Sequence, residues 1–157
     1  PAGIALTRQN IPVFQRGEGF ADASNTSKGA YTLVDAANGK PKLILIATGS
    51  EVQLAVAARE QLEAAGVPTR VVSAPCLEWF DEQPAAYREE VLPSKVQARV
   101  SVEAGLALGW SKYVGPFGKS VSIEHYGASA DYQTLFREFG ITTEAVVSTA
   151  KEVLKSL

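Results

Sequence analysis

Short apolar runs alternate with amphipathic segments along most of the chain, which indicates strands that alternate with helices. Residues 42–48 form a nearly continuous apolar run, as is typical of a strand covered on both faces of a parallel sheet. Residues 96–103 alternate strictly between apolar and polar side chains, which predicts a strand with one wetter face or end. We predict strands at residues 31–35, 42–48, 69–74, 96–103 and 120–124, the first of them at an edge of the sheet.

The helix after residues 42–48 has the clearest boundary signals. Ser50 and Gln53 have the spacing of a capping box, in which Ser50 caps the helix. Gly66 and Pro68 predict its end. One stripe of its surface is apolar and comprises Leu54, Ala55, Ala58, Leu62 and Ala65. A strand, this helix and the strand at 69–74 predict a right-handed parallel crossover.

Three further helices complete the predicted core. We expect one at residues 84–91, one at residues 132–139 that stops at Gly140, and a last one that Thr143 caps. Strands that alternate with helices predict an α/β fold, a three-layer α/β/α sandwich with about five strands.

The first 30 residues have a different character. Residues 3–7 predict a strand that residues 11–14 briefly continue, while residues 16–30 are rich in Gly, Ser, Asn and Asp and predict a linker or long loop. The residues before that linker are too few to bury a core of their own. The chain also begins with Pro1 and contains no methionine. We therefore expect it to be part of a longer polypeptide.

Composition and charge exclude several classes of protein. Of 157 residues, 46% are hydrophobic and 20% charged, which favours one folded core over disorder. The net charge of −2 gives no general attraction to nucleic acid or an anionic membrane. No apolar stretch approaches the roughly 20 residues that cross a bilayer. Cys76 is the single cysteine, which excludes an internal disulfide and fits a reducing, cytoplasmic location.

Residues 115–120, GPFGKS, resemble the end of a phosphate-binding P-loop. The full pattern needs a glycine at position 113, which holds Tyr113, and a helix rather than a strand after the loop. We interpret this segment as a turn with an exposed lysine.

Residues 127–131, GASAD, imitate the elbow around a nucleophilic serine, here Ser129. The pattern needs a glycine where Asp131 stands, and the single histidine, His125, lies too close in sequence to be a usual partner. We interpret the segment as a loop in which Ser129 or Asp131 caps the next helix.

Carboxylates follow three of the predicted strands. Glu51, Glu103 and Glu124 lie at strand ends or helix starts, where a parallel sheet gathers ligands, but capping or surface roles are the simpler interpretation. Gly49, Ser50 and Glu51 form a turn before a helix, whose free N–H groups favour a small anionic effector. Glu51 would repel a phosphate there, so we interpret the turn first as a helix cap. One histidine and one cysteine cannot form a structural zinc site.

The segment ALTRQN holds the remaining candidate. The guanidinium of Arg8 can bind phosphate oxygens in a two-point fashion, and the amides of Gln9 and Asn10 can orient it. Taken alone, one arginine after a strand is usually a surface charge.

Several longer motifs carry a family resemblance. They occur in the order in which transketolases have them: ALTRQN, LILIATGSEVQLAVAA, TRVVSAPCLEWFDEQ, YREEVLP, RVSVEAG, GWSKYVG, and HYGASA followed by LFREFG. The chain resembles the C-terminal third of a bacterial transketolase over essentially its whole length. Many relatives have proline where this chain has Asp131, and the residue type at His125 varies among them.

The resemblance implies a domain division and a fold. Residues 1–15 would end the preceding pyrimidine-binding domain, residues 16–30 would be a linker, and residues 31–157 would form the transketolase C-terminal domain. That domain is expected to contain a mixed, mostly parallel sheet of five strands with one antiparallel strand.

The resemblance also implies a function. Transketolases transfer a two-carbon ketol unit between sugar phosphates in the pentose phosphate pathway, as cytoplasmic homodimers that use thiamine diphosphate and a divalent metal, magnesium or calcium. Arg8 matches the arginine that binds the sugar phosphate, with Gln9 and Asn10 in support. The cofactor and metal ligands lie in the other domains, so this chain alone is expected to be inactive, with a structural, dimer-supporting or regulatory role. The alternative is a stand-alone module that binds a small anion at residues 48–51.

Overall fold

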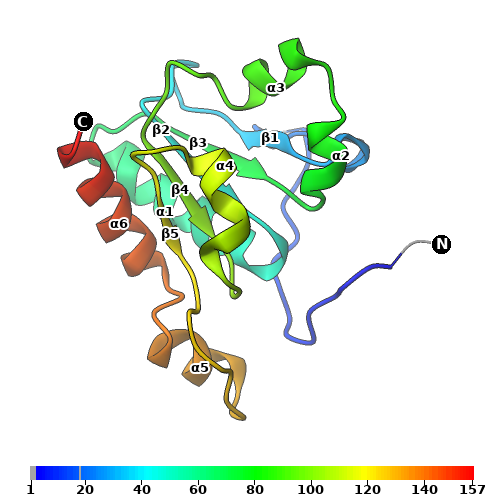
Figure 1. Cartoon of the computed structure of the whole chain (residues 1–157), viewed down its shortest axis with the longest axis vertical. Helices are drawn as coiled ribbons and strands as arrows, with labels where there is room; N and C mark the ends of the chain where they lie inside the picture. Colours follow the sequence, from blue (N-terminus) through cyan, green and yellow to red (C-terminus); the bar gives the residue numbers. More distant parts are fainter. Residues whose placement is uncertain (1–2, 18) are drawn as a thin grey trace.

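A five-stranded sheet forms the centre of the computed structural model, which describes residues 3–17 and 19–157 (Figure 1). The strand order is β1-β3-β2-β4-β5. β1 runs antiparallel to β3, and every other neighbouring pair is parallel, so the expected mixed, mostly parallel sheet is confirmed. The strands are β1 (Tyr31–Val34), β2 (Leu43–Ala47), β3 (Thr69–Ser73), β4 (Arg99–Val102) and β5 (Lys119–Val121).

Helices cover both faces of the sheet. One face carries α1 (Val52–Ala64) and α6 (Thr143–Lys155), and the other carries α2 (Leu77–Asp81), α3 (Ala85–Val91) and α4 (Ser111–Val114). Short 3-10 helices precede or join them: η1 (Ala23–Lys28), η2 (Gly49–Glu51) and η3 (Ala107–Trp110). In Figure 1, α5 (Tyr132–Glu138) lies beyond one end of the sheet, between β5 and α6.

The two-sided cover explains the apolar run of β2. All five of its residues are buried. Leu43, Leu45 and Ala47 belong to the core under α1 and α6, while Ile44 and Ile46 belong to the core under α2, α3 and α4. A strand with apolar side chains on both faces has no polar alternation, because neither face meets water. The predictions of a doubly covered strand and a three-layer sandwich are confirmed.

The predicted cap of α1 is wrong. Thr48 precedes a 3-10 turn, and α1 begins only after Glu51. The Gln53 side chain donates to the Ser50 carbonyl (3.0 Å), and the Ser50 hydroxyl donates to the Glu51 carboxylate, so neither makes a capping box. The extra turn moves the helix start past the residue that the spacing selected. The same one-residue error occurs at α6, where Thr142, rather than Thr143, accepts the capping hydrogen bond.

The alternation of residues 96–103 predicted a wetter face or a wetter end, and the structure shows the second, since Gln97 is exposed before β4 begins while Ser101 within it is buried. Ser101 is only 1% exposed, because β4 lies inside the sheet between β2 and β5. Its hydroxyl forms a 2.6 Å hydrogen bond with the hydroxyl of Ser120 on β5. A buried hydroxyl is tolerated when it has such a partner. The strand itself is also shorter than predicted, since it begins at Arg99.

The predicted N-terminal strand is absent from the described residues 3–17. Ile4 and Leu6 are each 83% exposed, and no strand of the described chain pairs with this segment. An isolated strand has no partner for its backbone N–H and C=O groups, so the segment stays extended without a ladder. Residues 1, 2 and 18, which fall in the predicted tail and linker, lie outside the described residues.

The predicted linker contains ordered structure. The Asp22 carboxylate caps η1 by accepting from the Ser24 N–H (2.8 Å), and η1 ends at Gly29. Gly29 has a φ of +81°, and a Cβ there would lie 2.3 Å from the Cys76 carbonyl oxygen. Only glycine allows both the left-handed backbone and this close approach. Residues 19–30 therefore pack against the start of α2, a helix that the sequence pattern did not reveal.

A partly buried ion pair fastens β1 to the rest of the sheet. Arg70 is 8% exposed and binds both carboxylate oxygens of Asp35, at 2.9 and 2.8 Å. Arg59 donates to the Asp35 carbonyl (2.6 Å). Burial raises the pKa of Asp35, but the Arg70 hydrogen bonds, the Ala36 N–H and the two positive charges outweigh it and hold the pKa below its usual value.

We expect Asp35→Asn to lower the free energy of unfolding at pH 7 by about 2 kcal/mol. Removing one partner of a fully buried pair costs about 3–5 kcal/mol, and the partial exposure of Asp35 reduces that figure. A carboxyl with a lowered pKa stabilises the fold above its unfolded pKa and loses that contribution as the pH falls through the folded pKa. Urea unfolding should therefore show a difference that shrinks as the pH falls.

Glu152→Gln is the matched control, since it breaks the exposed Lys119–Glu152 pair (2.9 Å). This variant should change stability by about 0–1 kcal/mol. If both variants cost the same at pH 7, the Asp35–Arg70 pair does not fasten β1.

Candidate functional site at the carboxyl edge of the sheet

The carboxyl ends of β2, β4 and β5 lie at one edge of the sheet, because these strands are parallel. Each of them is followed closely by a glutamate. We call these three residues the edge carboxylates: Glu51, Glu103 and Glu124. Backbone hydrogen bonds join the loops, from the Glu103 N–H to the Val121 carbonyl (3.1 Å) and from the Ile123 N–H to the Gly105 carbonyl (2.9 Å). The sequence correctly placed these carboxylates at strand ends.

Glu51 is the buried member, with 6% of its surface exposed. One carboxylate oxygen accepts from the Ser50 hydroxyl, and the other accepts from the Ala104 N–H (3.4 Å). Burial raises the pKa of Glu51, and the nearby charge of Glu103 adds to this, while the hydrogen bonds from Ser50 and Ala104 oppose it. Glu51 therefore joins the end of β2 to the loop after β4.

The other two edge carboxylates also bind N–H donors. Glu103 accepts from the indole N–H of Trp110 at 2.7 Å. Glu124 accepts from the Ala107 N–H at 2.9 Å, and this bond, with the Ser122 hydroxyl, lowers the pKa of Glu124. Both carboxylates thus hold η3, since Ala107 and Trp110 are its first and last residues. The predicted capping and surface roles do not describe these residues fully, because Glu51 is buried and Glu103 binds an indole instead of a helix end.

Trp110 is the residue that the sequence analysis did not single out. It is 3% exposed, and a buried indole N–H normally has an acceptor. Glu103 and Trp110 lie in different elements, so no strand or helix periodicity relates them. The only sequence signal for their hydrogen bond was a tryptophan a few residues after a carboxylate.

The turn of Gly49, Ser50 and Glu51 has few groups free for an anion. The Glu51 N–H donates to the Thr48 carbonyl, and the Val52 N–H donates to the Gly49 carbonyl. The Ser50 hydroxyl donates to the Glu51 carboxylate, which also accepts from the Ala104 N–H. This arrangement closes the turn internally and disfavours a phosphate there.

Arg8, Gln9 and Asn10 lie on the extended N-terminal segment. Arg8 and Asn10 are exposed, and Gln9 accepts a hydrogen bond from the Thr7 hydroxyl. Within the described residues, Arg8 has no hydrogen bond or ion pair, so neither amide orients its guanidinium here.

The residues that follow Arg8 reach the carboxyl edge. A cavity of ≈ 280 Å³ is lined by residues 11–14 and Arg16 together with Gly49, Val52 and Ser73. Phe14 stacks on Phe20 with ring centroids 5.0 Å apart. The segment that follows Arg8 thus lies beside the end of β2. Arg8 itself does not line this cavity.

The segments that resemble a P-loop (residues 115–120) and a nucleophile elbow (residues 127–131) have structural roles. Lys119 is the first residue of β5, and its ammonium pairs with Glu152. Because a strand and not a helix follows the loop, the P-loop interpretation is excluded. The Asp131 carboxylate caps α5 by accepting from the Thr134 N–H (3.0 Å), as the capping interpretation predicted. His125 donates from Nδ1 to the Tyr126 carbonyl (2.8 Å) and packs edge-on against Phe139.

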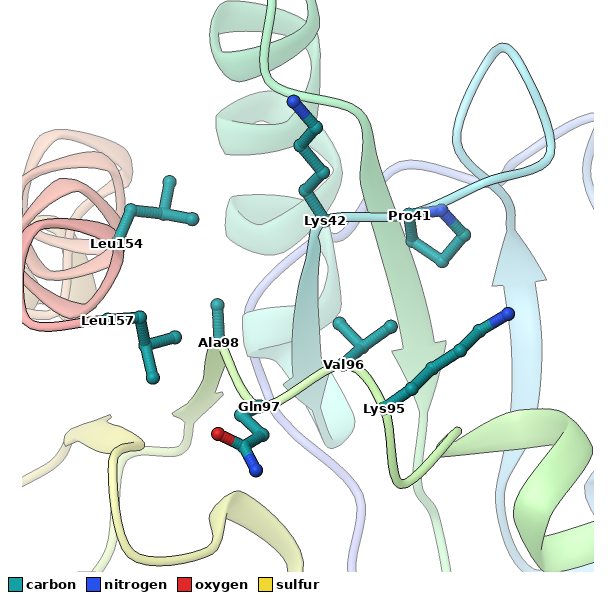
Figure 2. A pocket seen from close by; sticks show the side chains of 8 residues that line it. All are labelled: Pro41, Lys42, Lys95, Val96, Gln97, Ala98, Leu154 and Leu157. Atoms are coloured by element: carbon teal, nitrogen blue, oxygen red, sulfur yellow. The ribbon is translucent and has the colours of Figure 1, made fainter.

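A second concavity lies at the amino edge of the sheet. Figure 2 shows this pocket of ≈ 490 Å³, with Leu154 and Leu157 of the C-terminal segment on one side. The side chains of Lys42 and Lys95 extend away from each other, and Gln97 points in a third direction (Figure 2). Its polar groups do not converge, so it does not have the character of a specific site.

Residues 3–17 and 19–157 contain no group of three or more His, Cys, Asp or Glu side chains arranged to hold a metal ion. The edge carboxylates do not fit such a site, because each is already bound by N–H donors. No helix in the same residues has the length and apolar character needed to cross a membrane.

The layers, the mixed sheet and the hydrogen-bonded carboxyl edge define the chain as a three-layer α/β domain. The family model described as "Transketolase-like TK C-terminal domain" matches residues 29–142. The chain therefore belongs to the transketolase C-terminal domain family.

Curated relatives extend the similarity over nearly the whole chain. A transketolase of Mycobacterium leprae is 56% identical over 157 residues, and transketolase 1 of Escherichia coli K12 is 53% identical over 154 residues. Each match covers 98% of this chain, but only 22% and 23% of the respective relative. The chain thus spans about a fifth of the length of these relatives.

Solved structures agree with the fold. A transketolase from Leishmania mexicana superposes with a TM-score of 0.79 at 42% identity, over 88% of this chain and 20% of that one. A transketolase from Pichia stipitis, described as a complex with sedoheptulose-7-phosphate, has a TM-score of 0.79 at 38% identity, over 94% and 21%.

We expect Glu51→Gln to flatten the dependence of stability on pH. A carboxyl with a raised pKa gives its full stability below the unfolded pKa and loses it as the pH rises through the folded pKa. The neutral amide keeps an acceptor for Ala104 and removes the buried charge, so the variant should unfold at the same or higher urea concentration than the wild type at pH 7. Urea titrations from pH 4 to pH 8 measure this.

Glu51→Ala provides the comparison, since it removes the acceptor as well as the charge. This variant should be less stable than Glu51→Gln at every pH. A pH profile of Glu51→Gln that is parallel to that of the wild type would contradict the account of Glu51.

Proposed function

We propose that this chain is the C-terminal part of a transketolase, which transfers a two-carbon ketol unit between sugar phosphates in the pentose phosphate pathway. The observation that carries the proposal is the 56% identity to one transketolase over 98% of this chain, at only 22% of that protein's length. Such a match fits a C-terminal region joined to further domains.

We place the boundaries at residues 1–15 for the end of a preceding domain, 16–30 for the connection and 31–157 for the C-terminal domain. The match of the family model from residue 29 supports the second boundary. The exposure of Ile4, Leu6 and Val13 supports the first, because apolar side chains at 83% to 92% exposure require a covering partner. In this proposal, that partner is the rest of the preceding domain.

The cofactors belong to the other domains in this proposal. Thiamine diphosphate, with magnesium or calcium, would supply the carbanion chemistry from those domains, and this chain contributes to a cytoplasmic homodimer. The hydrogen-bonded edge carboxylates support this division, since they stabilise loops of the domain rather than offering ligands. The chain alone is inactive, and its role is structural, dimer-supporting or regulatory.

Arg8 binds the phosphate of the sugar substrate in the proposed enzyme, with Gln9 and Asn10 beside it. Its exposure and its lack of a partner within the described residues support this role, since a guanidinium without an ion pair can bind phosphate oxygens in a fork. The Pichia stipitis relative, described as a complex with a seven-carbon sugar phosphate, is consistent with such a ligand. Binding the phosphate far from the carbonyl would orient the reacting end.

We expect Arg8→Ala, made in the whole polypeptide, to lower kcat/KM for a phosphorylated ketose by roughly 10–100-fold, because a hydrogen-bonded charge pair contributes about 1.5–3 kcal/mol. The loss for an unphosphorylated ketose should be much smaller. Steady-state assays with both substrates measure the ratio. Arg137→Ala, at an exposed arginine of α5, is the control and should leave both values unchanged. Equal losses on both substrates would contradict the phosphate role.

The chain of residues 1–157, assayed alone with thiamine diphosphate and magnesium, should show no ketol transfer above the protein-free rate, because the cofactor-binding domains are missing from it. The whole polypeptide serves as the positive control under the same conditions. Turnover by the isolated chain would overturn the division of roles. Calorimetry of the same sample tests the alternative module, which predicts micromolar anion binding that Ser50→Ala weakens.

A further inference from the structure

A small pocket of ≈ 200 Å³ lies where α2, α3 and α4 meet the amino end of β4. Arg88 of α3, Arg99 of β4 and Lys112 of α4 line it, together with the carboxylates of Asp81 and Glu89. We call this the cation pocket. It is at the opposite end of β4 from the edge carboxylates, and Figure 1 shows α2, α3 and α4 around that region.

Both carboxylates of the cation pocket accept hydrogen bonds, and the partner of Asp81 is one of the pocket's own cations. Asp81 accepts from the Lys112 ammonium (2.6 Å) and from the Tyr113 hydroxyl (2.9 Å). Burial and the Asp81 carboxylate raise the pKa of Tyr113 to about 12, so the phenol stays a neutral donor. Glu89 accepts from the N–H and the hydroxyl of Ser94, both at 2.9 Å.

The guanidinium of Arg99 carries a charge that no carboxylate neutralises directly. It donates to the carbonyls of Leu92, Pro93, Val96 and Tyr113 at 2.8 to 3.1 Å. Carbonyl oxygens satisfy its N–H groups but leave its full positive charge at the pocket wall.

Arg88 has no partner for its buried donor. Its Nε is buried without a hydrogen-bond partner, the one such side-chain atom among the described residues, and no carboxylate of that part of the chain lies within ion-pair distance of it. A buried donor of this kind usually indicates a bound water or ion. Of the three cations that line the pocket, Lys112 is paired with Asp81, whereas Arg88 and Arg99 have no carboxylate partner within ion-pair distance among the described residues.

We propose that the cation pocket binds a phosphoryl group, with Arg88 as its principal ligand. The planar guanidinium of Arg88 matches two phosphate oxygens, and the charge of Arg99, which donates only to backbone carbonyls, adds to the attraction. The volume holds a phosphate and a small organic part. The shared chemistry is a phosphate dianion, either inorganic phosphate or a phosphate monoester. The pocket is formed by residues 80–113, so this inference stands independently of the role of Arg8.

Titration of the wild-type chain with inorganic phosphate and with glycerol 3-phosphate, at constant ionic strength, tests the site. Both should raise the midpoint of thermal unfolding, because a ligand that binds only the native state stabilises it. Arg88→Gln should weaken binding by about tenfold or more, since it removes a charged donor. A larger shift with the monoester identifies an organic phosphate as the source, and equal shifts identify the free anion; both outcomes support the site.

Arg137→Gln is the matched control and should bind phosphate like the wild type, because this arginine is exposed and paired with Glu138. Circular dichroism establishes that each variant is folded. If Arg88→Gln binds as tightly as the wild type, or if the wild type shows no shift at millimolar phosphate, the proposal is overturned.

A second measurement needs no substitution and so applies even where a variant does not fold. Phenylglyoxal modifies accessible arginine side chains, and peptide mass spectrometry of the modified wild-type protein gives a rate for each site. Phosphate should slow the modification of Arg88 several-fold and leave that of Arg137 unchanged. Equal rates at Arg88 with and without phosphate would exclude binding there.

Discussion

The buried Arg70 and the half-buried Arg99, from the strands on either side of β2, bind the carboxyl end of one short helix, and much of the domain depends on this contact. Arg70 of β3 donates to the carbonyls of Glu90 and Val91, and Arg99 of β4 donates to the next two carbonyls. The last carbonyls of a helix have no partner within the helix and carry partial negative charge. Cations supplied by the sheet satisfy them, so α3 is fixed to strands on both sides of β2.

This contact also explains why the two ends of the sheet differ. At the amino end of β4, Arg99 donates its hydrogen bonds to neutral carbonyls. Its charge is therefore not neutralised there, and the region keeps an excess of positive charge near Arg88. At the carboxyl edge, Glu51 and Glu103 accept from donors of the same domain, and the negative charge gathers there. The net charge of −2 hides this separation, because it sums over both ends.

The features that the sequence predicted well depend on local or two-sided burial. The continuous apolar run of β2 predicted a strand buried on both faces, because helices cover both sides of it. Gly66 and Gly140 also follow the helix ends that their positions in the sequence predicted. The features it missed depend on partners that are distant in sequence. Ser101 is buried because Ser120 pairs with it, and Glu51 closes a loop 53 residues further along the chain. No periodicity within a strand or helix encodes such pairs.

The candidate sites follow the same rule. Three carboxylates could be placed at strand ends from the sequence, because parallel strands end at one edge, but whether they bind a ligand or a neighbouring N–H depends on the loops between them. The cation pocket had no sequence signal, since Arg88 and Arg99 come from a helix and a strand joined by a loop. Its charge arises only when α3 is fastened by Arg70 and Arg99. An anion near this domain therefore meets repulsion at the helix start beside Glu51 and attraction at the opposite end of β4. For this reason we favour the cation pocket over the turn at residues 49–51 as an anion site.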